Sequence, residues 1–324
     1  MRPRHPAPRP LTEEVSGTVT QTVTLATGAA TVALAPEVGG AIASFRWRGH
    51  DVLRPTPVGA HVARDVRQFA CYPLVPYSNR IAQATLALGA NMHRLARNFG
   101  DHPHAIHGVG WQRAWTLEAH EPACARLVLD HVPSGEAGRG WPFAFQAMQA
   151  FVLTPLPDGA MLTLTLTIRN TDLRAFPFGL GWHPFFPRDA ATELGFAAEG
   201  VWETDDTCLP TKSVALPPDW RFDPLRAIGT TTLDNAFTGW RGDAEIRWPL
   251  TGHRALIEAD RACSHLIVFV PPGRDYFAVE PVTHMTDAFN RAARGERDTG
   301  TRHLQPDEER SCTMRIVATK YSNH

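Results

Sequence analysis

The stretch Met161-Leu162-Thr163-Leu164-Thr165-Leu166-Thr167-Ile168 decides the fold class of this chain. Its leucines and the final isoleucine occupy every second position, and threonines occupy most of the positions between them. Successive side chains of a β-strand point to opposite faces of a sheet, so this alternation predicts an antiparallel strand that is buried on one face only.

The same strand pattern recurs along the chain. Further strands are predicted at 17–25, 31–35, 42–47, 126–131, 143–153, 256–258, 266–270, 276–279 and 312–319. Turn signals such as Pro157-Asp158-Gly159 and Pro271-Pro272-Gly273 separate them. A helix is predicted only at residues 286–294, with Thr286 as its N-cap and Gly295 at its end. We therefore predict an all-β fold, a large antiparallel β-sandwich with few short helices, whose loops carry the functional residues.

The length of 324 residues suggests two domains, but a β-sandwich of this size can also be a single domain. Residues 1–11 are rich in Arg and Pro and lack the apolar core of a secretory signal. We expect residues 1–13 to be a disordered tail and residues 14–320 to form a single domain. No stretch approaches the ~20 apolar residues of a membrane span.

The charge and cysteine content narrow the class of partner. Thirty-two basic residues against 33 acidic ones give a net charge of −1, which argues against a nucleic-acid or anionic-membrane surface. We expect a small ligand that is uncharged or only locally charged. The five cysteines are odd in number and widely spaced, so reduced thiols and a cytoplasmic location are predicted.

Five short polar segments interrupt the strand pattern and supply side chains suited to a hydroxyl-rich ligand. They are Asn79-Arg80-Ile81, His107-Gly108, Gly181-Trp182-His183-Pro184-Phe185-Phe186, Asp234-Asn235-Ala236-Phe237 and Glu280-Pro281. Together they contain one guanidinium, two imidazoles and two carboxylates. A histidine and a glutamate among them are candidates for an acid/base pair.

Three of these residues also have an ordinary structural interpretation. Arg80 follows an apolar, proline-rich stretch, where its donors serve either sugar oxygens or loop carbonyls and an internal carboxylate. His107 is near two other histidines, but no carboxylate or cysteine at ligand spacing joins them, so an imidazole that donates to a ligand oxygen is favoured over a metal ligand. The structural alternative is a loop histidine bonded to the backbone. Asp234 precedes Asn235, and such pairs are common in turns.

His183 and Glu280 are the sharper candidates. His183 lies among aromatic residues and precedes a proline, which restricts its backbone to extended geometry. Glu280 is predicted at the end of strand 276–279, where burial raises the pKa of a carboxyl and a nearby imidazolium lowers it. A core histidine bonded internally and a structural ion pair are the alternatives.

The order of the five segments resembles that of the aldose 1-epimerase (galactose mutarotase) family. That family has an Arg in an Asn-Arg-Ile type segment, then a His-Gly, a His-Pro-aromatic-Phe, an Asp, and a Glu near the C-terminus. In this chain the matching residues are Arg80, His107, His183, Asp234 and Glu280. The resemblance extends from about residue 15 to residue 319.

The resemblance implies a galactose mutarotase-like sandwich with an open sugar-binding cleft, and no metal or cofactor. It implies that Glu280 removes the proton of the C1 hydroxyl while His183 protonates the ring oxygen, so that the sugar opens and recloses from either face. A nearby carboxylate is expected to raise the pKa of His183 above about 6.5. The residues expected to hold the ring oxygen and hydroxyls are Arg80, His107, Asp234 and Asn79.

One departure from the family pattern bears on the substrate. Gly181-Trp182 replaces the Thr-Asn-type lead-in of the best-known galactose mutarotases, which indicates a divergent bacterial branch. A hexose-6-phosphate mutarotase needs a basic pocket, and no dense arginine cluster adjoins the five segments, so a free monosaccharide is the predicted partner. A non-catalytic sugar-binding protein and a glycoside hydrolase using Asp234 and Glu280 are further alternatives. The sequence leaves monomer and homodimer open.

Overall fold

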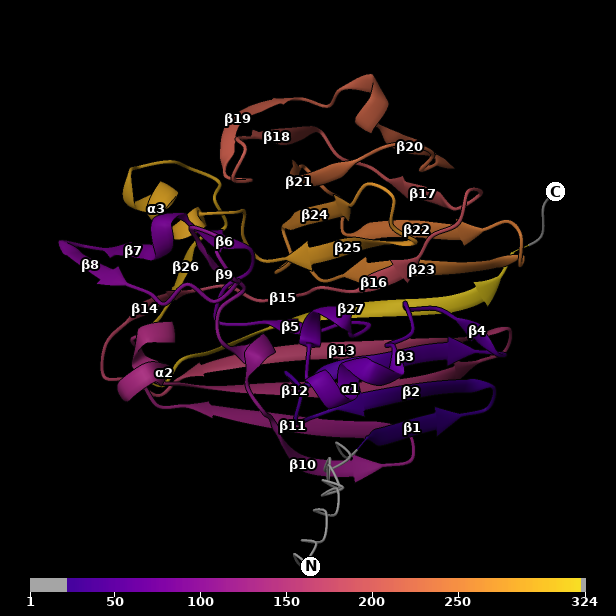
Figure 1. The fold of residues 1–324 in the computed structure, drawn as a ribbon, viewed down its shortest axis with the longest axis horizontal. Coiled ribbons are helices and arrows are strands. Elements are labelled where there is room, and N and C mark those ends of the chain that lie inside the picture. Colours follow the sequence, from indigo (N-terminus) through magenta and orange to yellow (C-terminus); the bar gives the residue numbers. More distant parts are fainter. Residues whose placement is uncertain (1–21, 322–324) are drawn as a thin grey trace, which may run out of the picture.

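Residues 22–321 are described by the computed structural model, and most of their strands lie in three antiparallel sheets (Figure 1). A nine-stranded sheet has the order β10-β11-β12-β13-β27-β23-β22-β17-β20, and an eight-stranded and a four-stranded sheet accompany it. One buried hydrophobic cluster contains side chains from all three sheets, so they pack around a shared core. The predicted all-β fold, an antiparallel β-sandwich with few short helices, is confirmed.

The bounds of the elements are as follows. The nine-stranded sheet comprises β10 (Thr116–Glu121), β11 (Cys124–His131), β12 (Phe145–Leu156), β13 (Gly159–Asn170), β27 (Glu309–Lys320), β23 (His253–Ala259), β22 (Asp243–Trp248), β17 (Glu193–Phe196) and β20 (Phe222–Ala227). The eight-stranded sheet comprises β19 (Pro210–Ala215), β18 (Gly200–Thr204), β21 (Leu233–Thr238), β24 (His265–Val270), β25 (Tyr276–Val282), β15 (Gly181–Trp182), β5 (Pro73–Leu74) and β16 (Phe185–Pro187). The four-stranded sheet comprises β1 (Val23–Thr27), β2 (Ala30–Ala35), β3 (Ala41–Trp47) and β4 (His50–Asp51).

Short elements cover the ends and edges of these sheets. Two-stranded pairs are β6 (Arg80–Ile81) with β9 (Ala105–Ile106), β7 (Thr85–Leu88) with β8 (Asn91–Arg94), and β14 (Phe176–Phe178) with β26 (Arg302–Leu304). The helices are α1 (Val58–Ala63), α2 (Gly135–Gly140) and α3 (Ala288–Ala293), with 3₁₀ turns η1 (Val66–Gln68), η2 (Ala82–Ala84), η3 (Gly110–Gln112) and η4 (Pro218–Trp220). Figure 1 shows α3 beside β6 to β9 at one end of the molecule.

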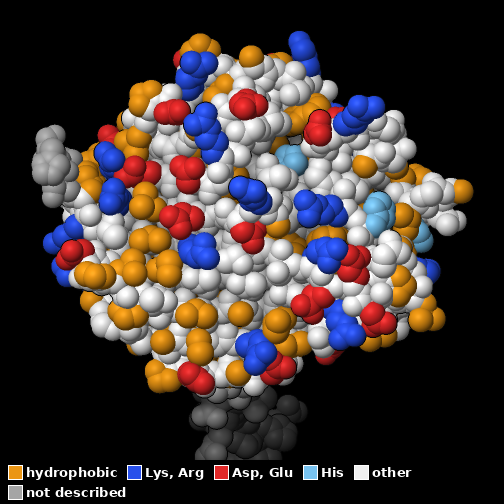
Figure 2. All heavy atoms as spheres, turned by 180° about the vertical axis from the view of Figure 1, so that it is seen from behind, with side chains coloured by type: hydrophobic (Ala, Val, Ile, Leu, Met, Phe, Trp, Pro, Cys, Tyr) orange, Lys and Arg blue, Asp and Glu red, His pale blue; other side chains and the backbone are white. Residues whose placement is uncertain are grey.

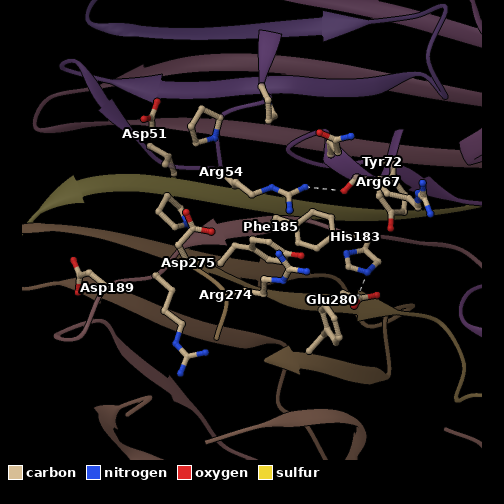
Figure 3. Close-up of a pocket in the computed structure, with 18 of the residues that line it drawn as sticks. Asp51, Arg54, Arg67, Tyr72, His183, Phe185, Asp189, Arg274, Asp275 and Glu280 are labelled. Carbon is tan, nitrogen blue, oxygen red and sulfur yellow. Dashed lines mark hydrogen bonds and ion pairs between the residues drawn. The ribbon is translucent and has the colours of Figure 1, made fainter. Parts of the chain in front are cut away.

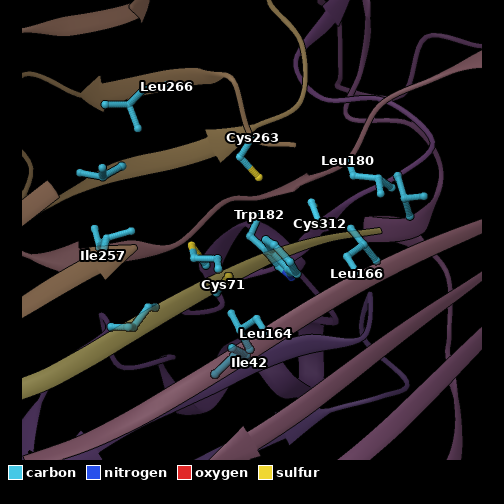
Figure 4. Packing of buried hydrophobic residues seen from close by; sticks show 14 of the residues in the cluster. Ile42, Cys71, Leu164, Leu166, Leu180, Trp182, Ile257, Cys263, Leu266 and Cys312 are labelled. Carbon is cyan, nitrogen blue, oxygen red and sulfur yellow. The ribbon is translucent and has the colours of Figure 1, made fainter. Parts of the chain in front are cut away.

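The alternating stretch 161–168 lies within β13, as predicted. Its leucines and Ile168 are buried, whereas Thr163 and Thr165 are only partly covered. Leu164 pairs with Phe151 of β12 on one side and with Met314 of β27 on the other. Figure 4 shows Leu164 and Leu166 packed near Trp182 and Ile257 in the core.

Most predicted strands are present, and their observed ends differ from the predicted ones by a few residues. The strands predicted at 31–35, 42–47, 126–131, 143–153, 256–258, 266–270 and 312–319 correspond to β2, β3, β11, β12, β23, β24 and β27. The strand predicted at 276–279 continues to Val282, because β25 pairs with β24 through Glu280 and Pro281. Glu280 therefore lies inside a strand and not at its end, so that prediction was wrong.

The predicted helix 286–294 is shorter than expected. It begins at Ala288, and its N-cap position is occupied by Asp287, not by Thr286. Asp287 has a left-handed backbone with φ of 54°, which prevents the helix from starting earlier. Its side chain is used elsewhere, because Asp287 Oδ1 accepts a hydrogen bond from the backbone N–H of Ala82.

Several expectations concern residues outside the described range. The tail predicted at residues 1–13 lies there, and so does the first part of the strand predicted at 17–25, which appears as β1 from Val23. A single domain over 14–320 stays a prediction. Within residues 22–321, no helix is long and apolar enough to cross a bilayer. The face shown in Figure 2 carries acidic and basic side chains interspersed, in keeping with the balanced net charge.

Candidate active site

All six predicted site residues line one cavity of about 1090 Å³. They are Asn79, Arg80, His107, His183, Asp234 and Glu280. Arg80 comes from β6, Asp234 from β21 and Glu280 from β25, while His107 and His183 follow β9 and β15. Segments spread over two hundred residues of sequence are thus brought to one place by the fold. Figure 3 shows the part of the cavity around His183 and Glu280.

Strand register places His183 opposite Glu280. Gly181 pairs with Val282, and Phe185 pairs with Ala278, both on β25. His183 is midway between Gly181 and Phe185, and Glu280 is midway between their partners Val282 and Ala278. The register therefore leaves His183 and Glu280 facing each other. His183 Nε2 lies 3.3 Å from Glu280 Oε1, the contact dashed in Figure 3.

Both members of this pair are buried, and burial determines their protonation. Glu280 is 2% exposed and His183 is 7% exposed. Burial raises the pKa of Glu280 well above its usual range, and the nearby charge of Asp234 raises it further. Burial, followed by the positive charge of Arg54, lowers the pKa of His183 to about 3. The expected upward shift of the histidine pKa is therefore wrong, because desolvation and the neighbouring guanidinium charges lower it.

Two atoms of the pair lack hydrogen-bond partners. Among residues 22–321, neither Glu280 Oε2 nor His183 Nδ1 has one, although both atoms are buried. Buried polar atoms are normally satisfied, and exceptions call for a functional explanation. Both residues line the cavity, so a molecule bound there is the candidate partner.

Aromatic side chains fix the imidazole of His183 from two sides. Its ring stacks on Phe185 at a centroid distance of 4.3 Å and lies 4.9 Å from the ring of Tyr72. Tyr72 is in turn stacked on Trp111 at 5.6 Å. These contacts restrict the ring orientation without adding a charge. They also place apolar rings against the imidazole of His183.

Arg80 and Asp234 form an ion pair across the cavity wall. Arg80 Nη2 lies 3.0 Å from Asp234 Oδ2, and Arg80 Nη1 donates to Asn79 Oδ1 at 2.9 Å. Asp234 lies within β21, paired with Phe269 of β24, so the turn interpretation of this residue was wrong. Arg80 does hold an internal carboxylate, as one alternative had it, and it also lines the cavity.

Hydrogen bonding fixes the tautomer of His107. Its Nδ1 accepts the backbone N–H of Asn79 at 3.0 Å. Burial, the neighbouring imidazole of His183 and the positive charge of Arg80 lower the pKa of His107 well below its usual range, so the ring is neutral and its proton resides on Nε2. Gly108 follows with φ of +70°, and a Cβ there would meet the carbonyl oxygen of Val75 at 2.3 Å, which explains the glycine.

The backbone around Arg80 is held by acceptor side chains from distant parts of the chain. Four backbone N–H groups donate to them: Ser78 to His284 Nε2 at 3.1 Å, Asn79 to His107 Nδ1 at 3.0 Å, Ala82 to Asp287 Oδ1 at 3.0 Å, and Gln83 to His104 Nδ1 at 3.0 Å. Three of the acceptors are imidazole nitrogens, which accept only when the ring is unprotonated. The position of Arg80 thus depends on histidines that do not all contact the cavity.

We expect His104→Leu to weaken ligand binding without touching the acid/base pair. Leucine removes the acceptor for the N–H of Gln83, so the strand that carries Arg80 loosens and KM rises about 3–10-fold with kcat nearly unchanged. His104→Asn, which keeps an acceptor near the position of Nδ1, should restore most of the affinity. Steady-state kinetics of the two variants test this; equal KM values would contradict a positioning role.

Arg54 and Tyr72 are among the cavity residues that were not predicted from the sequence. Arg54 sits between Leu53 and Pro55 with no polar segment around it, so nothing marked it. Tyr72 opens the apolar, proline-rich stretch that precedes Arg80, and that stretch was the only available signal. Within the described part of the chain, no group of three or more His, Cys, Asp or Glu side chains is placed to hold a metal ion.

Comparisons with known proteins agree with this geometry. A family model described as Aldose 1-epimerase matches residues 21–317. YphB of Escherichia coli K12, an uncharacterized protein, is 29% identical over 266 residues, which are 80% of this chain and 87% of YphB. The crystal structure of an E. coli K12 protein provisionally assigned as an aldose 1-epimerase has a TM-score of 0.82 at 27% identity and covers 93% of this chain and 99% of that one. A galactose mutarotase-like protein of Clostridium acetobutylicum, 20% identical, shares the fold with a TM-score of 0.80 over 92% of this chain and 95% of its own.

Proposed function

This chain belongs to the aldose 1-epimerase family of isomerases, and we propose that it interconverts the α and β anomers of an aldose whose C1 hydroxyl is free. The observation that carries the proposal is the buried pair of His183 and Glu280, 3.3 Å apart on the wall of the cavity, each with an unpartnered atom. Sugar binding alone does not require such a pair. Proton transfer at two oxygens of one sugar does.

The pair contains one transferable proton. When no sugar is bound, the pKa shifts place this proton on Glu280 and leave His183 neutral. A C1 hydroxyl that donates to the unpartnered Oε2 stabilises the carboxylate form of Glu280, because hydrogen bonds to a charged group favour that form. The proton then passes to His183 over the short separation between the two side chains. This state gives Glu280 the role of base and His183 the role of acid.

Ring opening then follows in one balanced step. Glu280 takes the proton of the C1 hydroxyl, the C1–O1 bond becomes a carbonyl, and the electron pair of the breaking C1–O5 bond goes to the ring oxygen. His183 delivers its proton to that oxygen. Rotation about C1–C2 presents the other face of the aldehyde, and the two residues exchange roles as the ring closes. Each positioned group contributes about 10²–10⁴-fold.

The remaining polar residues are suited to holding the sugar. His107 presents its Nε2–H as a donor because Nδ1 is already occupied. Arg80 is paired with Asp234, so this part of the wall offers both donors and acceptors to hydroxyl groups with no net charge. The same ion pair argues against a hydrolase that uses Asp234, since Oδ2 of this carboxylate is already engaged by Arg80. The free thiols of all five cysteines suit the expected cytoplasmic location.

Anomer interconversion measured by polarimetry or by NMR on a panel of aldoses tests the proposal. The wild-type protein should bring a freshly dissolved single anomer to equilibrium faster than the buffer alone. A disaccharide should be incubated in parallel. Release of a monosaccharide would favour the hydrolase, and binding without catalysis would favour a sugar-binding protein.

The pH dependence should be broad. The pair keeps its single transferable proton between the low pKa of His183, about 3, and the raised pKa of Glu280. We therefore expect kcat to change little across the neutral range and to fall in strong acid, where His183 takes a second proton. On the alkaline side kcat falls when the pair loses its proton. An acid limb near the ordinary histidine pKa of about 6.5 would contradict this assignment.

A further inference from the structure

Arg54 is a cation of the cavity wall that has no carboxylate partner. It lines the same cavity as His183 and forms none of the ion pairs found among residues 22–321. Burial lowers the pKa of its guanidinium, which reflects the cost of removing the charge from water. A buried charge of this kind is normally paired.

The guanidinium is nevertheless held in one position. Its Nη2 donates to the carbonyl oxygens of Arg67 at 2.9 Å and Phe69 at 2.8 Å. Its carbon Cζ lies 3.9 Å from the ring centroid of Phe185 and 4.3 Å from that of Tyr276. Figure 3 shows Arg54 above Phe185, with its guanidinium directed towards Arg67. A fixed guanidinium with unused donors is pre-organised for an anion.

The other charges around the cavity do not cancel Arg54. Three further arginines of the lining have acidic partners: Arg67 with Asp65, Arg80 with Asp234 and Arg254 with Glu245. Two carboxylates of the lining, Asp189 and Asp275, are exposed, so water screens them. The half-buried Arg54 is screened less than these two carboxylates.

We propose that the substrate is an aldose with an anionic group at the end of the sugar remote from C1, and that Arg54 recognises this group. The inference rests on the proposed function, which places C1 at Glu280 and His183. Phe185 is the spacer: His183 stacks on its ring, and so does Arg54. A pyranose, also a six-membered ring, lying along this stack with C1 at His183 brings its far substituent to Arg54.

The arginines of this cavity could not be recognised as a cluster in the sequence. Arg54, Arg188 and Arg274 come from three distant segments, and the fold brings them to one cavity. The sequence-based preference for an unphosphorylated sugar rested on the lack of a local cluster. The shared chemistry is an anion, and a phosphate or a carboxylate at C6 would provide it.

Anomer interconversion should be compared for an aldohexose, its 6-phosphate and its uronic acid. For the wild type we expect kcat/KM to be about 10–100-fold higher for at least one charged sugar than for the neutral parent. The two charged sugars distinguish phosphate from carboxylate recognition. The advantage should shrink as salt is added, since screening weakens the attraction.

Variants connect the preference to Arg54. Arg54→Met should reduce the ratio of charged to neutral kcat/KM to near one, while Arg54→Lys should keep part of it. The ratio is taken within one variant at one pH, so any change in the pKa of His183 cancels. Arg254 lines the same cavity but is already paired with Glu245. Arg254→Met should therefore leave the ratio of charged to neutral kcat/KM unchanged.

The outcomes separate this inference from the proposed function. A wild type that converts the neutral sugar as fast as both charged sugars supports the epimerase and overturns the role of Arg54. A preference that survives Arg54→Met also overturns it. A wild type that converts none of the three sugars overturns the proposed function, and this inference with it.

Discussion

Glu280→Gln is expected to lower kcat for anomer interconversion by about 10²–10⁴-fold with little change in KM. The amide keeps the shape of the side chain inside β25 but cannot take the proton of the C1 hydroxyl. Because Glu280 also contributes the transferable proton in the open cavity, the variant loses both functions of the carboxyl. Steady-state kinetics by polarimetry, with anomeric NMR signals integrated over time for slow turnover, measure the loss.

A matched control and a folding measurement make this result interpretable. Glu203→Gln changes an exposed carboxylate on β18 that does not line the cavity, so its kcat should equal that of the wild type. Thermal unfolding should show that Glu280→Gln is as stable as the wild type or more so, because a buried carboxyl without full hydrogen bonding is costly. Near wild-type turnover in a folded Glu280→Gln protein would exclude Glu280 as the base.

The fold was predictable because its strongest signal is local. The alternation in 161–168 specifies one buried face, and β13 lies inside the nine-stranded sheet with that face covered, although Thr167 of the other face is buried too. Strands such as β10 were missed, since all six of its residues are exposed and no apolar alternation marks it. The end of β25 was misplaced because Glu280 and Pro281 resemble a strand terminus, although the register with β24 continues through both.

The candidate site was predictable only as a set of residue types in order. The sequence does not show that His183 and Glu280 face each other, since this follows from β15 and β16 both pairing with β25. It also does not show how deeply they are buried, and the direction of the His183 pKa shift was wrong for that reason. Arg54 escaped prediction because its significance lies in what surrounds it in space.

His183→Asn is expected to lower kcat by a similar factor of about 10²–10⁴, because asparagine cannot carry the proton to the ring oxygen. His253→Asn is the matched control, because His253 lines the same cavity from β23. Its ring is hydrogen-bonded to the carbonyl oxygen of Thr251, so replacing the imidazole should leave kcat unchanged. A folded His183→Asn protein with near wild-type kcat would exclude the imidazole as the acid.

The double variant tests whether the two residues share one proton. If His183 and Glu280 act as a unit, the first substitution already removes the proton transfer, and the second has little left to remove. We therefore expect kcat of the double variant to be within about threefold of that of the slower single variant. This is far above the kcat that would result if the two separate losses multiplied. Losses that multiply would instead show two independent groups, each acting through water. The pair 3.3 Å apart predicts the first result, because the proton that His183 delivers to the ring oxygen comes from Glu280, so that either substitution removes it.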